Sequence, residues 1–135
     1  MSIEQDLFVS EAYQGQLVEL ITATEDIPTQ IIEEQEDIGS DLKCLRLALY
    51  DSRDEMADRM NNWAHGGIKW GAEDKWLLSA ALVTQVEIGK VPPEIFRGYT
   101  KSFFDFFLDE AQSRGKVPTP QTQSLIDEIR ERLDI

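Results

Sequence analysis

The chain has 135 residues, of which 41% are hydrophobic and 29% are charged, and its formal net charge at pH 7 is −13. This length and composition are typical of one folded domain spanning residues 1–135, and they exclude a low-complexity or disordered chain. The acidic balance argues against direct binding of nucleic acid or of an anionic membrane, because both are recognised mainly through lysine and arginine.

The negative charge is concentrated near the N-terminus. Residues 1–42 contain eleven carboxylates and no lysine or arginine, and the first cation is Lys43. We call this segment the acidic flank. A surface without compensating cations attracts basic partners over a Debye length of roughly 8–10 Å.

Three features bear on the compartment. Cys44 is the single cysteine, so no intramolecular disulfide can form. Residues 1–6 lack the cationic start and the apolar stretch of a signal peptide. The longest uncharged apolar-rich run, at 76–86, is too short to span a bilayer. We therefore expect a cytoplasmic protein without membrane contact.

Helix signals recur in the first half of the chain. An amphipathic pattern predicts a helix over residues 2–23, and Pro28 suits the first turn of a second, short helix. Gly39 and Ser40 are expected to end that helix and to cap a third one, from Asp41 to about His65. The third helix carries an apolar stripe of Leu42, Leu45, Leu49, Met56, Met60 and Trp63.

Helix signals also dominate the second half, and strand signals are scarce. A fourth helix, at residues 72–89, is apolar nearly all round, which predicts that it lies at the centre of the fold. A fifth helix is expected from Glu94 to Arg114, stopped by Gly115, and a last one begins at Pro120 with Thr119 as its N-cap. The fold class is therefore all-α, a single-domain bundle of five or six helices.

The acidic flank is the first candidate site. Its carboxylates predict a docking surface for a basic protein, formed by Glu25, Asp26, Glu33, Glu34, Glu36, Asp37 and Asp41. The alternative interpretation is a solvated surface that only keeps the protein soluble. An ordinary solvent-exposed surface mixes charges of both signs, and this segment does not.

A second acidic group is expected on one face of the third helix, where Asp51, Glu55 and Asp58 follow at helical spacing. We favour a solvated face for these three, which would extend the docking surface. The spacing of Glu33-x-x-Glu36 and Glu55-x-x-Asp58 also resembles the paired acids of the all-α MazG-type NTP pyrophosphatases. That resemblance implies an alternative function, Mg²⁺-dependent hydrolysis of nucleotides, in which these four acids hold the metal. Asp58 departs from the family's pattern, because a polar stretch follows it.

The fifth helix is rich in phenylalanine, and its aromatic residues cover about 200° of its surface, more than one core contact needs. Phe106 is the member we expect to be exposed. A third hypothesis is therefore a structural subunit that forms a homodimer through Phe106.

The leading hypothesis is an acidic protein-binding module without enzymatic activity. It would be an inhibitor or an immunity-like protein that occludes a basic, nucleic-acid-binding or nuclease-type partner. We predict no catalytic residue, no metal site and no cofactor, because the chain has neither a Ser-His-Asp set nor a Cys/His metal spacing.

Overall fold

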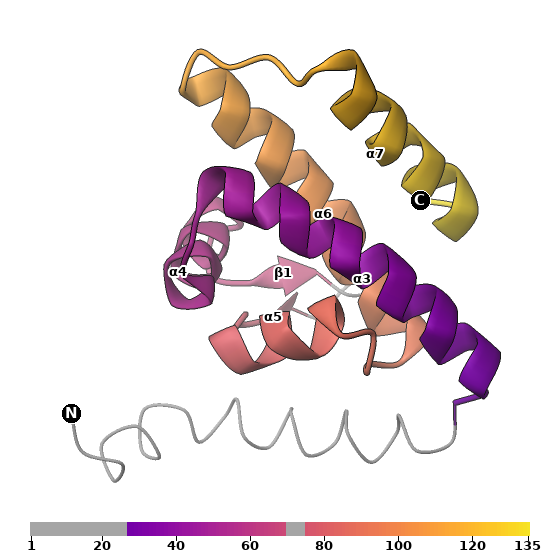
Figure 1. The fold of residues 1–135 in the computed structure, drawn as a ribbon. Coiled ribbons are helices and arrows are strands. Elements are labelled where there is room, and N and C mark those ends of the chain that lie inside the picture. Colours follow the sequence, from indigo (N-terminus) through magenta and orange to yellow (C-terminus); the bar gives the residue numbers. More distant parts are fainter. Residues whose placement is uncertain (1–26, 70–74) are drawn as a thin grey trace, which may run out of the picture.

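The computed structural model describes residues 27–69 and 75–135, which form five α-helices and one two-stranded sheet (Figure 1). In chain order these elements are α3 (Thr29–Leu49), α4 (Arg53–Trp63), β1 (Ile68–Lys69), β2 (Lys75–Trp76), α5 (Ala80–Glu87), α6 (Pro93–Ser113) and α7 (Pro120–Leu133). A mostly helical chain is thereby confirmed for the described residues. The helix expected at 2–23 lies outside them.

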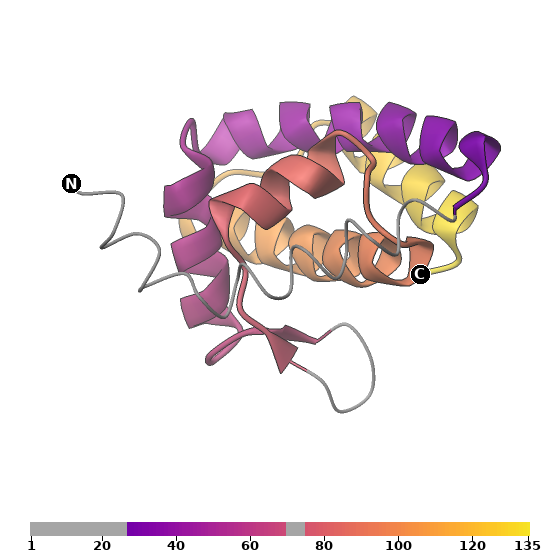
Figure 2. The same cartoon turned by 90° about the horizontal axis from the view of Figure 1, so that it is seen from below.

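Helix α6 carries the largest share of the core. It contacts α3, α4, α7 and β1, and α3 runs alongside it (Figures 1 and 2). Nine of its side chains are buried: Ile95, Phe96, Tyr99, Thr100, Phe103, Phe104, Phe106, Phe107 and Ala111. The prediction of a central helix at 72–89 is therefore wrong. α5 has only eight residues, and four of them are buried.

The sequence predicted that a helix ends at Gly39, but Gly39 lies inside α3. The reason is close packing against α5. A Cβ atom at Gly39 would overlap the backbone carbonyl of Glu87 and would lie 2.8 Å from the carbonyl oxygen of Val86. Next to this contact, the buried Gln35 side chain donates hydrogen bonds to the carbonyl oxygens of Gly89, at 2.9 Å, and Val91, at 2.8 Å. The absent side chain therefore lets two helix backbones meet.

The helix predicted from Asp41 to His65 is interrupted at residues 50–52, and α3 and α4 meet there at a corner. Arg46 donates through Nη1 to the carbonyl oxygens of Tyr50, at 3.1 Å, and Asp51, at 2.9 Å. Ser52 then caps α4, because its hydroxyl accepts a hydrogen bond from the Glu55 amide. The corner thus satisfies backbone groups that would otherwise be unpaired.

The segment before α5 also differs from the prediction, which placed the helix start near residue 72. β1 and β2 pair antiparallel, with Ile68 opposite Trp76 and Lys69 opposite Lys75. Beyond β2, the Asn61 side chain forms two hydrogen bonds of 2.8 Å with the backbone N–H and carbonyl of Leu78. Those bonds hold Leu78 outside the helix, which begins only after Ser79, its N-cap.

The last two helices agree with the prediction. α6 ends at Ser113, and Gly115 follows with a φ of 70°, a conformation that favours glycine. Thr119 caps α7 by accepting a hydrogen bond from the Thr122 amide, and Pro120 is the first helical residue. α7 packs on α6 through the buried residues Ile126 and Ile129.

Candidate protein-binding surface

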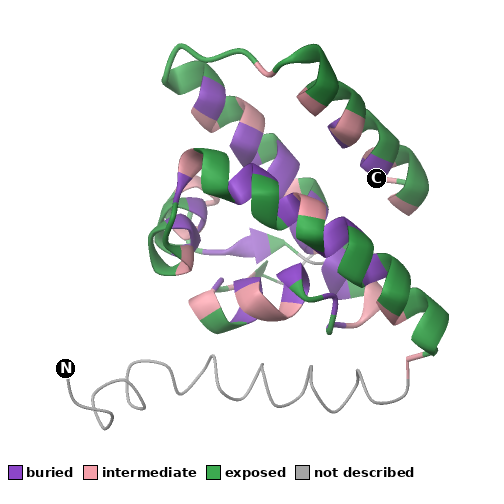
Figure 3. Cartoon of the chain, in the orientation of Figure 1, coloured by how far each residue is buried: buried purple, intermediate pink, exposed green. Residues whose placement is uncertain are grey.

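The outer surface of α3 is acidic because the helix turns its apolar side to the core. Gln35, Ile38, Leu42 and Leu45 are buried, and most of the charged positions on the other side of the helix are exposed (Figure 3). The exposed carboxylates are Glu33, Glu34, Glu36 and Asp37, while Asp41 is half-buried. Of the predicted docking residues, Glu25 and Asp26 lie outside the described residues.

One cation from a distant part of the sequence lies against this surface. The guanidinium of Arg132, on α7, is 3.6 Å from a carboxylate oxygen of Glu34 and 3.7 Å from one of Asp37. All three side chains are at least one-third exposed, so each pair contributes no more than about 1 kcal/mol to stability. The acidic surface is therefore less uniform than the sequence of the flank alone predicts.

Asp41 differs from its neighbours in its electrostatic environment. Its pKa is raised above the ordinary value of 3.8, first by partial burial and then by the negative charges of Asp37 and Glu128, while Arg132 opposes the increase. Asp41 on α3 and Glu128 on α7 are thus within electrostatic reach of each other. Charges of both signs on α7, Glu128 and Arg132, therefore act on this carboxylate of α3.

The second acidic group does not lie on one helix face as predicted. Asp51 belongs to the corner between α3 and α4, whereas Glu55 and Asp58 lie on α4. All three are exposed. Because the chain turns at this corner, Asp51 does not share a helix face with Glu55 and Asp58.

The alternative metal site would need Glu33 and Glu36 close to Glu55 and Asp58. The first pair lies near the start of α3, and α4 follows the opposite end of that helix. Within residues 27–69 and 75–135, no group of three or more His, Cys, Asp or Glu side chains is placed to hold a metal ion. The geometry gives no support to a metal site at these four acids.

A buried charge cluster escaped the sequence analysis. The carboxylate of Glu87, on α5, accepts hydrogen bonds from Arg46 Nε at 2.6 Å, Arg46 Nη2 at 3.3 Å and Arg53 Nε at 3.0 Å. The side chains of Arg46 and Glu87 are only 2% and 1% exposed. Two features of the sequence could have indicated this cluster. Arg46 lies within the apolar stripe, and Glu87 ends an otherwise apolar segment. The cluster joins α3, α4 and α5.

Phe106 was expected to be exposed, and that prediction is wrong. Its side chain is 1% exposed. The ring stacks on Tyr50 at a centroid distance of 6.3 Å and meets the edge of Trp63 at 5.7 Å. Because α4 and the corner cover this side of α6, the broad aromatic arc is buried on two sides. A homodimer through Phe106 therefore loses the observation on which it rested.

No protein-family model, curated protein or solved structure matches the chain. Among the helices of the described residues, none combines the length and the hydropathy needed to cross a bilayer.

Proposed function

We propose that the protein is a cytoplasmic, non-enzymatic binding module that docks on a basic protein through the outer surface of α3. The partner would be an enzyme or binding protein that acts on nucleic acid, and this chain would act as an inhibitor or immunity-like protein. Its carboxylates would occupy the cationic surface that otherwise contacts phosphates.

The observation that carries the proposal is the group of four exposed carboxylates Glu33, Glu34, Glu36 and Asp37 on α3. Among the described residues, Arg132 is the one cation in ion-pair contact with them. Glu55 and Asp58 are also exposed, but they lie on α4, beyond the opposite end of α3, and would add a second, separate acidic contact beside Arg59. Charges of one sign on an exposed surface accelerate association with a partner of the opposite sign, and salt weakens that acceleration.

The test begins with affinity capture from a lysate of the native host at low and at high salt, followed by association kinetics with the purified partner. The α3 variant carries Glu33→Gln, Glu34→Gln, Glu36→Gln and Asp37→Asn. The matched control carries four neutralised exposed acids on α6 and α7 or just beyond α7: Glu94→Gln, Asp127→Asn, Glu131→Gln and Asp134→Asn. Both variants lose four negative charges, so they separate a local surface from the total charge.

We expect the wild-type protein to capture a basic protein and to compete with nucleic acid for it. The α3 variant should associate at least about tenfold more slowly at low salt, and the control variant should stay much closer to wild type. If the two variants slow association equally, the total charge of the protein explains the effect, and the α3 acids form no specific docking surface. Capture of no basic protein would leave them with a role in solubility only.

A further inference from the structure

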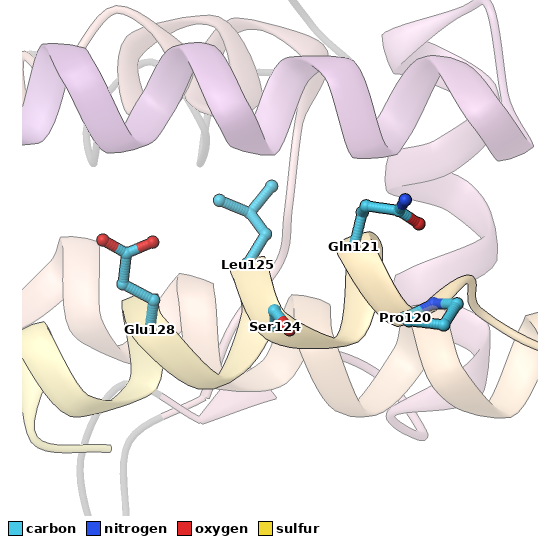
Figure 4. Close-up of a pocket in the computed structure, with 5 residues that line it drawn as sticks. All are labelled: Pro120, Gln121, Ser124, Leu125 and Glu128. Carbon is cyan, nitrogen blue, oxygen red and sulfur yellow. The ribbon is translucent and has the colours of Figure 1, made fainter.

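A hollow of about 500 Å³ lies along one side of α7. Its lining residues are Pro120, Gln121, Ser124, Leu125 and Glu128, which recur at helical spacing. In Figure 4 the side chains of Gln121, Leu125 and Glu128 point toward α3. All five lining residues belong to α7, so the hollow is a depression on the side of α7 that is directed toward α3.

The facing wall of α3 has small side chains. Asp37, Asp41, Cys44 and Ala48 follow at spacings of four, three and four residues and so share one face of the helix. That face is turned to α7, because Asp37 is paired with Arg132. Cys44 and Ala48 are exposed. We call the two surfaces that this face of α3 and the lining residues of α7 turn toward each other the α3–α7 groove.

The groove is apolar at one end and acidic at the other. Pro120 and Leu125 supply the apolar part. Glu128 points toward α3 in the acidic part, whose α3 side holds Asp37 and Asp41, with Asp37 paired to Arg132 of α7. Among the described residues, Asp41 and Glu128 form no ion pair within 4 Å, although the positive charge of Arg132 acts on Asp41 from nearby. From Pro120 to Glu128 the helix rises about 12 Å, which equals roughly two turns of a helix lying beside it.

We propose that the α3–α7 groove binds a short basic amphipathic helix of the partner protein. A leucine-sized side chain of that helix contacts Leu125 and Pro120, and a lysine or arginine one turn away lies between Asp41 and Glu128. Charge complementarity selects this occupant, because the groove offers two carboxylates beside an apolar contact. The inference rests on the proposed function and specifies where on the acidic surface a partner is recognised.

The test uses a defined probe, a synthetic peptide of 14 residues with leucine on one helical face and lysine on the other. The control is an oligolysine that carries the same charge. Binding is measured by calorimetry, and the rate of Cys44 modification by a disulfide reagent reports occupancy of the groove. Cys44 suits this purpose because it is exposed and is the single cysteine.

Three variants locate the contact. Leu125→Ser removes the apolar contact, Glu128→Gln removes one charge, and Glu131→Gln is the matched control on an exposed position outside the hollow. Gln121→Trp fills the groove from an exposed position, so it tests the site even if Leu125→Ser destabilises α7. We expect Leu125→Ser, Glu128→Gln and Gln121→Trp to weaken the amphipathic peptide about fivefold or more, and Glu131→Gln to change binding less than about twofold.

The amphipathic peptide should slow Cys44 modification, and oligolysine should not. The inference is overturned if the peptide does not bind, if oligolysine protects Cys44 equally, or if none of the three groove variants weakens binding. Failure of the proposed function is distinguishable from these results. If a natural partner requires the α3 acids but not Leu125, the groove inference is wrong and the proposed function stands. If the peptide binds but no basic protein is captured from the lysate, the proposed function is wrong and the groove inference stands.

Discussion

Replacing Gly39 by alanine tests whether this glycine is required by the close packing of α3 against α5 or occupies an ordinary helix position. In an exposed helix interior, Gly→Ala stabilises by about 1 kcal/mol. At Gly39 the new methyl group would overlap the backbone carbonyl of Glu87. Neither backbone can rotate out of the way, so α3 would have to move away from α5. Overpacking of this kind costs about 1–3 kcal/mol.

The same movement would stretch the two hydrogen bonds from Gln35 to the Gly89 and Val91 carbonyl oxygens, and each such bond contributes about 1 kcal/mol. After subtracting the helix-propensity gain, we expect Gly39→Ala to lower the free energy of unfolding by about 2 kcal/mol. For a chain of this size that corresponds to a decrease in Tm of about 6–8 °C.

The assay is thermal and urea unfolding followed by far-ultraviolet circular dichroism. The control is Ser40→Ala, at the neighbouring exposed position of α3, which should leave the stability unchanged or slightly raise it. A Gly39→Ala variant that is as stable as wild type, or more stable, would refute the close-packing argument and would indicate that α3 and α5 do not meet at this residue.

Three further predictions concern buried and charged groups. Glu87→Gln should cost about 3–5 kcal/mol in urea unfolding, because it leaves Arg46 buried beside a neutral side chain, and Arg46→Met in the same chain should recover part of that loss. A double variant that loses the full sum of the single losses would argue against this pairing. Phe106→Ala should cost about 3–5 kcal/mol through the cavity it creates between Tyr50 and Trp63, without changing the mass seen in sedimentation; a stable variant with an altered mass would restore the dimer hypothesis. Because the pKa of Asp41 is raised above 3.8 in the folded protein, its contribution to stability falls as the pH rises from 3.8 through the folded pKa. Asp41→Asn should therefore gain about 0.2–0.5 kcal/mol at pH 7, with the gain disappearing below pH 3.8, and a loss at pH 7 would contradict the repulsion from Asp37 and Glu128.

The elements that the sequence predicted well are those with purely local signals. The fifth predicted helix and α6 differ by one residue at each end, and α7 begins at Pro120 behind its Thr119 cap, as expected. Proline, threonine and glycine act through their own backbone geometry and the next turn of helix. Such signals can be interpreted without knowing what lies nearby in the fold.

The errors share a different cause. Gly39 is needed inside a helix because the backbone of Glu87 packs against it, and Leu78 stays outside the next helix because the Asn61 side chain binds its backbone. In both cases the deciding partner is distant in the sequence. The same is true of Phe106, whose exposure was misjudged because Tyr50 and Trp63 cover it from other elements.

For the candidate site, the sequence by itself determined that the run of acids from Glu33 to Asp37 lies on the outer side of its helix, opposite apolar residues such as Ile38. Only the tertiary structure decided how that charge is distributed. It places Arg132 beside Glu34 and Asp37, exposes Asp41 to the charges of Arg132 and Glu128 on α7, and buries Glu87 between two arginines. The physical reason is that helical periodicity follows from local geometry, whereas the electrostatic environment of each carboxylate depends on which distant segments pack against it.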